Sequence, residues 1–347
     1  MSVYIQSAEQ ISAQKPLSDE WFDNPVFYGE QCAPTINPDF TPYFSPIMSR
    51  RMDMLVKRAV ALSRQTLKEA SIEMPDAIIA GTGLGCIDSV EKFLYSITEN
   101  GEKFLQPTHF MQSSHNIISS TIAIEMKCHG YNNTYMHRGV SFENALLDAI
   151  MQLEKDTVQN VLVGGFDELT NDYYKFFERI GIWDFKTGSS PKKKCFAGEA
   201  AVGMLLGKTK NERTICEING IDLLHKPSYE HLQESLDALL AKAGCPLSGI
   251  DAILTGLNTN MENDRIYRNV IDRFFGDIPI LQYKHLFGES FSSSAIGVYV
   301  ALTCIRKGYV PAILSADKDT DISPVKHILV YNHFRNKTHS FILLSSC

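Results

Sequence analysis

The stretch Pro75-Asp-Ala-Ile-Ile-Ala-Gly-Thr-Gly83 has the pattern of a buried β-strand, because a short apolar run ends in small residues. A similar stretch, Ile250-Asp-Ala-Ile-Leu-Thr-Gly-Leu-Asn258, follows 175 positions later, since 251 − 76 = 175. A second pair of similar stretches, 119–124 and 293–298, has nearly the same separation, since 293 − 119 = 174. Two matches separated by about half of the 347 residues predict that the chain consists of two related halves.

Apolar residues at helical spacing precede each copy of the first stretch, and they predict an amphipathic helix before each strand. These residues are Met52, Leu55, Ala59 and Leu62 in one half, and Leu232, Leu236, Leu239 and Ala243 in the other. Ser228 and Gly244 are predicted to cap the second of these helices. Further apolar runs predict strands at 160–165, 200–206, 310–315 and 341–344.

Helices that alternate with strands predict an α/β fold, here two stacked mixed sheets with helices between them and outside them. We expect one domain, 1–347, whose N-terminal half spans about residues 1–214 and whose C-terminal half spans about residues 215–347.

The composition is that of an ordinary globular protein, with 44% hydrophobic and 21% charged residues. A net charge of −7 argues against nucleic-acid binding, which needs a basic face. No apolar run is long enough to span a membrane and the first 15 residues lack a signal-peptide core, so we expect a cytoplasmic protein. The eight cysteines have neither zinc-ligand nor disulfide-framework spacing, so no metal is expected.

A glycine stands at a position where enzymes often place a nucleophile. In Thr134-Tyr-Met-His-Arg-Gly-Val-Ser-Phe-Glu-Asn-Ala145, a β-like run from Tyr135 to Gly139 passes sharply into a helix. The amino terminus of a helix favours negative charge, which is why a reactive Cys or Ser is often found at such a turn. Gly139 has no side chain that could react.

Several motifs together resemble those of the β-ketoacyl synthase family. The segment Pro107–Asn116, followed by 122–124, resembles the segment before the active-site strand in synthases of aryl polyene and flexirubin-type pigment pathways. Residues 161–168 resemble the strand after the nucleophile helix, and Cys195–Val202 resembles the Gly-Glu-Gly-Ala-Gly turn of the family. The resemblance covers nearly the whole chain and implies a thiolase-like fold, in which duplicated halves form αβαβα layers.

The resemblance also implies that the catalytic residues are absent. In active members, a Cys attacks an acyl thioester, and two His side chains then hydrogen-bond the thioester oxygen as a malonyl extender decarboxylates. Alignment without gaps places Gly139 at the Cys, Gly256 at the first His and Glu289 at the second His, whereas the family's Lys is retained as Lys284.

Such losses predict an inactive site. Removal of one oxyanion donor typically costs about 10²- to 10³-fold in rate, and removal of the nucleophile removes the covalent pathway. An ionised Glu289 would also repel the malonyl carboxylate. The segment 332–338, at the place of the family's glycine-rich gating loop, contains no glycine.

Three residues near these positions were considered as substitute nucleophiles. Ser141 is interpreted as a capping or exposed hydroxyl, and Cys195 and Cys86 as buried, inert thiols. His137 is interpreted as a packing or dimer-contact residue. Lys284 is expected to persist because it pairs with a buried carboxylate.

We therefore expect a degenerate, chain-length-factor-like subunit that pairs with an active ketosynthase in fatty-acid-like or polyketide-like (aryl polyene) biosynthesis. One alternative is an active 3-oxoacyl-carrier-protein synthase that uses another thiol. A second is a non-catalytic homodimer that binds acyl chains or carrier proteins. No cofactor is expected, because the acyl chains would arrive on the phosphopantetheine of an acyl carrier protein.

Two groups of residues are predicted to contact partners or ligands. The pocket or interface candidates are Met111, Met136, His137, Phe142, Cys195, Phe196 and Phe334. The candidates for docking an acidic carrier protein are the basic residues Arg50, Arg51, Lys192, Lys193 and Lys194.

Overall fold

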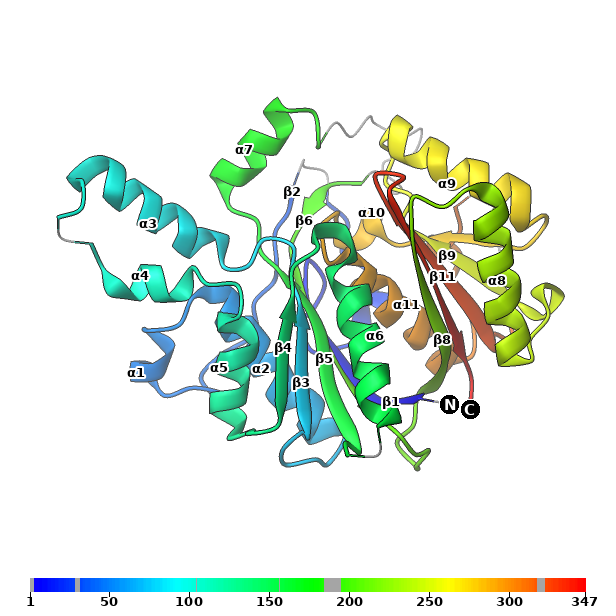
Figure 1. Cartoon of the computed structure of the whole chain (residues 1–347), viewed down its shortest axis with the longest axis horizontal. Helices are drawn as coiled ribbons and strands as arrows, with labels where there is room; N and C mark the ends of the chain where they lie inside the picture. Colours follow the sequence, from blue (N-terminus) through cyan, green and yellow to red (C-terminus); the bar gives the residue numbers. More distant parts are fainter. Residues whose placement is uncertain (1–2, 29–31, 104, 156, 184–194, 317–321) are drawn as a thin grey trace.

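The computed structural model describes residues 3–28, 32–103, 105–155, 157–183, 195–316 and 322–347. Its strands form a ten-stranded sheet with the order β10-β9-β11-β12-β8-β1-β7-β5-β3-β4, and a two-stranded sheet of β2 and β6 (Figure 1). The strands are β1 (Val3–Ile11), β2 (Cys32–Ala33), β3 (Ala77–Gly81), β4 (Tyr131–Tyr135), β5 (Asn160–Asp167), β6 (Ala197–Gly198), β7 (Ala200–Gly207), β8 (Cys216–His225), β9 (Ala252–Thr255), β10 (Ile280–Gln282), β11 (His327–Phe334) and β12 (Thr338–Ser345).

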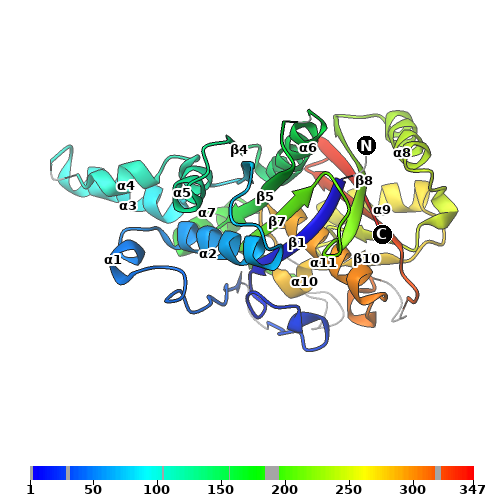
Figure 2. The same ribbon diagram turned by 90° about the horizontal axis from the view of Figure 1, so that it is seen from below.

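Helices connect most of these strands. They are α1 (Pro46–Ser49), α2 (Met54–Glu69), α3 (Ile87–Asn100), α4 (Pro107–Gln112), α5 (Ile117–Met126), α6 (Ser141–Glu154), α7 (Asn171–Arg179), α8 (Tyr229–Ala243), α9 (Met261–Phe274), α10 (Lys284–Phe287) and α11 (Ser293–Lys307). The predicted caps of α8 are confirmed, because His231 N donates to Ser228 Oγ and Gly244 adopts the left-handed conformation. Helices α3 and α4 extend away from the body of the molecule (Figure 2).

The two halves of the large sheet have the same strand order. Each half contributes five strands to the large sheet. When these five are numbered along the chain, they lie side by side in the order first, fifth, fourth, second, third. This gives β1-β7-β5-β3-β4 in one half and β8-β12-β11-β9-β10 in the other. In both halves, two antiparallel pairs are followed along this order by two parallel pairs. The halves join where Val3–Ile5 pairs with Cys216–Ile218. This arrangement is that of a duplication.

Alternating side chains of each strand enter different cores, which produces five layers. Ala77 and Ile79 of β3 pack in an inner core with α6 and α11, whereas Ile78 and Ala80 pack in an outer core with α2 and α5. In the other half, Ile328 and Val330 of β11 enter the inner core and Leu329 enters a second outer core with α8 and α9. The expected αβαβα layers are therefore present, and the two stacked sheets are halves of one continuous sheet.

One of the two predicted repeat matches is wrong. Stretches 75–83 and 250–258 do contain equivalent strands, β3 and β9. In contrast, Ser119 lies in α5, before the third strand of its half, whereas Ser293 begins α11, after the third strand. By position in the fold, the counterpart of α11 is α6, which begins at Ser141. The similarity of 119–124 to 293–298 is thus coincidental.

Two predicted strands also differ from the structure. The apolar run 310–315 contains a short 3-10 helix, Ala312–Leu314, because Pro311 has no backbone N–H for a strand ladder. The run from Tyr135 to Gly139 is not a strand, since β4 ends at Tyr135 and a 3-10 turn, Arg138–Val140, leads into α6. The strands predicted at 160–165, 200–206 and 341–344 are confirmed as β5, β7 and β12.

Candidate functional site

The ring of Phe334 fills the space beside Gly139. Gly139 is buried in the turn between β4 and α6. A β-carbon on residue 139 would lie 2.3 Å from Cδ2 of Phe334, the last residue of β11. Carbon atoms in contact are normally about 3.5–4.0 Å apart. Any side chain at position 139 would therefore overlap the ring unless Phe334 moved.

A tight hairpin and a series of aromatic rings hold Phe334 in this place. Arg335 and Asn336 have φ values of 52° and 53°, and Lys337 N donates to Phe334 O at 3.0 Å. The ring centroid of Phe334 is 6.0 Å from that of Phe291, which in turn packs against Phe177 of α7. The segment at the place of the family's gating loop is thus a closed β-hairpin without glycine.

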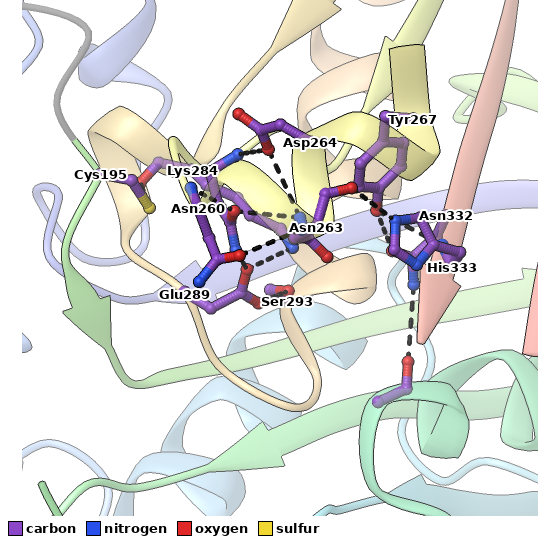
Figure 3. Close-up of polar contacts among 12 residues, drawn as sticks. Cys195, Asn260, Asn263, Asp264, Tyr267, Lys284, Glu289, Ser293, Asn332 and His333 are labelled. Atoms are coloured by element: carbon purple, nitrogen blue, oxygen red, sulfur yellow. Dashed lines mark hydrogen bonds and ion pairs between the residues drawn. The ribbon is translucent and has the colours of Figure 1, made fainter. Parts of the chain in front are cut away.

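Tyr267 of α9 occupies the space beside Gly256. A β-carbon on residue 256 would lie 2.2 Å from Tyr267 Oη and 3.0 Å from Lys284 Nζ. Tyr267 is fully buried, and its hydroxyl donates to Asn332 Oδ1 at 2.7 Å (Figure 3). Burial raises the pKa of Tyr267 well above its ordinary value, so the hydroxyl keeps its proton. Gly256 therefore leaves no vacant position for a catalytic side chain.

Lys284 and Glu289 form a buried ion pair. Their Nζ and Oε2 atoms are 2.6 Å apart, and the two side chains are 5% and 15% exposed (Figure 3). Asn258 Nδ2 also donates to Oε2 at 2.6 Å, and Ser293 Oγ donates to Oε1 at 3.1 Å. Burial disfavours the charged ammonium, but the Glu289 carboxylate together with Tyr283 and Cys195 outweighs burial, so the pKa of Lys284 is raised. The charge of Glu289 is thus compensated within the protein by Lys284.

A second buried carboxylate ties the surrounding elements together. Asn332 Nδ2 donates to Glu143 Oε1 at 2.8 Å and lies 3.5 Å from the carbonyl oxygen of Gly139. Ser294 Oγ donates to Glu143 Oε2 at 2.9 Å. Glu143 is fully buried, and burial raises the pKa of its carboxyl group. These contacts connect α6, α11 and β11, and they leave the turn at Gly139 fixed from several sides.

A cavity of about 440 Å³, whose wall is part polar and part aromatic, adjoins this network. The structure brings Gly139, Lys284, Glu289 and Phe334 together in its wall. Asparagines that the sequence analysis did not identify supply much of the rest, together with aromatic rings. The lining includes Trp183, Asn258, Asn260, Glu262, Asn263, Ser290, Phe291, Ser293, Asn332, His333 and Arg335. The site thus has room for a ligand beside a set of side chains that bond to one another, among them Lys284, Glu289 and Asn258.

The three residues considered as substitute nucleophiles are buried. Burial raises the pKa of Cys195 well above the ordinary thiol value, and burial with the charge of Asp53 raises that of Cys86. Ser141 Oγ accepts from His137 N at 2.8 Å and lies 2.9 Å from the carbonyl oxygen of Thr82. Both thiols are therefore protonated and inaccessible at neutral pH, and Ser141 stabilises the turn.

The predicted pocket and interface residues are divided between core and surface. Phe142 is fully buried in the inner core, and Phe196 is buried against Ala13 and Ala33, so neither reaches the surface. In contrast, Met111 and Met136 are 65% and 44% exposed, and His137 is exposed.

Of the five predicted basic docking residues, the structure describes two. Arg50 and Arg51 are exposed, and Gln112 of α4 hydrogen-bonds the carbonyl oxygen of Arg51. Lys192, Lys193 and Lys194 lie outside the described residues.

The described ranges contain neither a metal-binding cluster nor a helix that could span a membrane. No group of three or more His, Cys, Asp or Glu side chains in those ranges is arranged to hold a metal ion. No helix in them combines the length and the apolar character needed to cross a membrane.

Comparison with solved structures gives a close match of fold. The ishigamide ketosynthase/chain length factor structure has a TM-score of 0.81 and 17% identity, over 100% of this chain and 99% of that one. The ketosynthase ApeO in complex with its chain length factor ApeC, from Xenorhabdus doucetiae, has a TM-score of 0.82 and 15% identity, over 100% and 98%. A β-ketoacyl synthase from Burkholderia phymatum has a TM-score of 0.81 and 13% identity, over 99% of both chains. The fold is therefore that of the thiolase-like ketosynthases.

Sequence comparison assigns the family. No protein with a curated description matches the chain. The family model for the N-terminal domain of β-ketoacyl synthases matches residues 20–241, which is more than half of the chain. By this match, the chain belongs to the β-ketoacyl synthase family.

Proposed function

We propose that this chain is a catalytically inactive ketosynthase-like subunit of the chain-length-factor type. It pairs with an active ketosynthase that makes fatty-acid-like or polyketide-like products such as aryl polyenes. The observation that carries this proposal is the Phe334 ring at the position where a nucleophile at residue 139 would project. A ring there excludes an acyl chain as well as a cysteine.

The chemistry of the site supports the loss of condensation. Decarboxylative condensation requires a thiolate and neutral donors aimed at the developing enolate oxygen. Here Tyr267 uses its hydroxyl proton in the bond to Asn332, and Lys284 is paired with Glu289. The hydroxyl proton of Tyr267 and the charge of Lys284 are therefore engaged by groups of the protein itself.

The burial of the two thiols argues against an active synthase. That alternative requires Cys195 or Cys86 to form a thioester, and both are buried with raised pKa values. Incubation with an acylated carrier protein, followed by intact mass spectrometry, tests it. An adduct that disappears in Cys195→Ala or Cys86→Ala would support an active synthase and contradict our proposal.

An unpaired sheet edge supports a partner subunit. Within the described ranges, β4 pairs with β3 along one side and with no strand along the other. Apolar residues are exposed beside it, among them Ile124 on α5 at 73% and Met136 after β4. Open edges and exposed apolar groups are typical of interfaces. Two of the solved relatives are described as ketosynthases with chain length factors, and a third as a ketosynthase with an acyl carrier protein.

The cavity favours a second candidate function, a homodimer that binds acyl chains or carrier proteins without reacting with them. Its volume of about 440 Å³ and its mixed polar and aromatic wall suit a small ligand. This candidate predicts self-association in the absence of a ketosynthase.

Co-expression with an active ketosynthase from the same genome tests the leading proposal. With an affinity tag on this chain alone, we expect both proteins to co-purify and to elute as one heteromer in size-exclusion chromatography. Elution as two separate species would contradict the proposal, and a stable dimer of this chain alone would favour the second candidate.

A further inference from the structure

The cavity beside Gly139 has two pairs of opposite charges, one inside it and one at its exposed mouth. The inner pair, Lys284 and Glu289, is mostly buried with Nζ and Oε2 2.6 Å apart, so its charges compensate each other. The outer pair, Arg335 and Glu262, lines the cavity and is exposed. His333, also in the wall, is neutral at neutral pH because burial lowers its pKa to about 3. A ligand therefore meets uncompensated charge only at the mouth.

The two charges at the mouth are not used inside the protein. Within the described ranges, neither Arg335 nor Glu262 forms an ion pair. The Cζ atom of Arg335 lies 5.5 Å from the ring centroid of Phe334, at the edge of the cavity. Glu262 is in the first turn of α9, where Asn260 already caps the helix by accepting from Glu262 N and Asn263 N. Both charges are thus available to a ligand.

The fold brings these two charges together. His333 Nε2 lies 3.1 Å from the carbonyl oxygen of Asn263, and this contact joins the end of β11 to the first turn of α9 (Figure 3). Arg335 follows His333 by two residues, and Glu262 directly precedes Asn263. One small ligand can therefore place a carboxylate at Arg335 and an ammonium group at Glu262.

Arg335 keeps its place in an unfavourable backbone conformation. Its φ of 52° is in the left-handed region, which residues with a β-carbon rarely adopt. Turn positions of this kind favour glycine or asparagine, and Asn336 is the next residue. Residues held in such conformations cluster at sites that bind ligands. An arginine at this position is therefore explained by its charge and not by the turn.

Three aromatic rings, those of Trp183, Phe291 and Phe334, form the apolar part of the wall. Trp183 and Phe291 each pack edge-to-face against Phe177, and the ring centroids of Phe291 and Phe334 are 6.0 Å apart. Rings arranged in this way favour a further ring as their neighbour. The volume of about 440 Å³ is near the lower end of the range for ligand pockets, about 300–1,000 Å³. The cavity therefore suits a small molecule with one aromatic group.

We infer that this cavity binds a free aromatic amino acid, with its carboxylate at Arg335, its ammonium group at Glu262 and its ring against the aromatic wall. Glu262 would repel a plain acid and Arg335 a plain amine, so a molecule with both charges is favoured over either. Since the inner pair of charges is compensated, the uncharged ring enters the interior and the charged groups stay at the mouth. Binding of this ligand does not require a ketosynthase and is independent of the proposed function.

Isothermal titration calorimetry of the purified chain with L-phenylalanine tests the binding. We expect saturable binding with a Kd of about 1 mM or below, which is typical of a ligand of this size. 3-Phenylpropionate lacks the ammonium group and 2-phenylethylamine lacks the carboxylate, so each should bind at least about tenfold more weakly. L-Alanine lacks the ring and should also bind more weakly. Absence of saturable binding up to about 10 mM L-phenylalanine, or tighter binding of pantetheine, would overturn the inference.

Two variants at exposed positions separate the two charges. Arg335→Gln should bind L-phenylalanine about tenfold more weakly, but should bind 2-phenylethylamine at least as well as wild type, because this amine has no carboxylate. Glu262→Gln should also lose affinity for L-phenylalanine, but not for 3-phenylpropionate. Lys337→Gln is the matched control, because Lys337 is exposed in the same turn but does not line the cavity. Equal affinities for L-phenylalanine in all four proteins would contradict the assignment.

Tryptophan fluorescence locates the ring of the ligand. The chain has two tryptophans, Trp183 in the cavity wall and Trp21 in the inner core. L-Phenylalanine should change the emission of wild type, and Trp183→Phe, which keeps a ring, should lose this change. A change that persists in Trp183→Phe would place the ligand elsewhere and overturn the inference. Failure of these tests would leave the pairing with a ketosynthase unaffected, because they use this chain alone.

Discussion

The ring of Phe334 lies against Gly139 so closely that a β-carbon on residue 139 would be 2.3 Å from Cδ2 of the ring. The empty position in the turn and the ring of the β11–β12 hairpin are therefore complementary. A glycine is needed at position 139 because the hairpin fills the space, and the hairpin can fill it because residue 139 is glycine. Residues 139 and 334 would therefore have to change together before a reactive side chain could fit at position 139.

Gly139→Cys alone should destabilise the protein without producing a synthase. Overpacking of a closed site typically costs about 1–3 kcal/mol in the free energy of unfolding, which urea denaturation measures. Phe334→Ala/Gly139→Cys should recover much of this loss and make the new thiol reactive with iodoacetamide. If Gly139→Cys were as stable as wild type and readily alkylated, the ring would not occupy this space in solution.

Lys284 and Glu289 should behave as one unit. Loss of one partner of a buried ion pair typically destabilises by about 3–5 kcal/mol, because the other charge remains buried. Lys284→Met and Glu289→Gln should each lower the free energy of unfolding by a large amount, and the double variant by less than the sum. A double-mutant cycle with no coupling would show that the pair is not formed.

Two buried histidines should make a destabilising contribution in mild acid. Burial, with the charge of His339, lowers the pKa of His333 from 6.5 to about 3, and burial lowers that of His339 to about 4. At these two sites the unfolded chain binds more protons below pH 6.5, so the contribution of the two histidines to the free energy of unfolding should decrease from pH 6.5 towards 4. His339→Gln should flatten this dependence between pH 7.5 and 5, whereas His231→Gln, at an exposed position, should leave it unchanged. Equal slopes in all three proteins would contradict this assignment.

Met136 should contribute to the partner interface. It is 44% exposed next to the outer edge of β4. Met136→Asp would place a charge in the apolar centre of the interface, and we expect at least about tenfold weaker binding to the ketosynthase in isothermal titration calorimetry. Met261→Asp, at an exposed position on α9, is the matched control and should bind normally. Equal affinities would place the interface elsewhere.

Most of the fold could be predicted from local patterns. The strands β3 and β9 are short apolar runs after amphipathic helices, and such patterns depend on neighbouring residues alone. The match of 119–124 to 293–298 failed because it compared residue types without the order of strands and helices around them. The prediction of a strand at 310–315 was wrong because it relied on the apolar pattern alone. Pro311 within the run should have argued against a strand.

Less of the candidate site than of the fold could be predicted from the sequence. The positions of Gly139, Lys284 and Glu289 could be inferred from the family resemblance, and Phe334 was identified as a pocket candidate. The contact between Phe334 and Gly139 was not predicted, because it joins residues 195 positions apart, since 334 − 139 = 195. Tyr267 was missed because its place on α9 looks like any core position of a helix. Asn332 gave a signal that was overlooked, a polar residue within the apolar run of β11.

The most direct test of the central claim locates the acyl group in the assembled complex. The complex of this chain with its ketosynthase is incubated with an acylated carrier protein and analysed by intact mass spectrometry under denaturing conditions. We predict that the acyl adduct is found on the ketosynthase and that this chain keeps its unmodified mass. An acyl adduct on this chain, at any cysteine, would contradict its assignment as the inactive subunit.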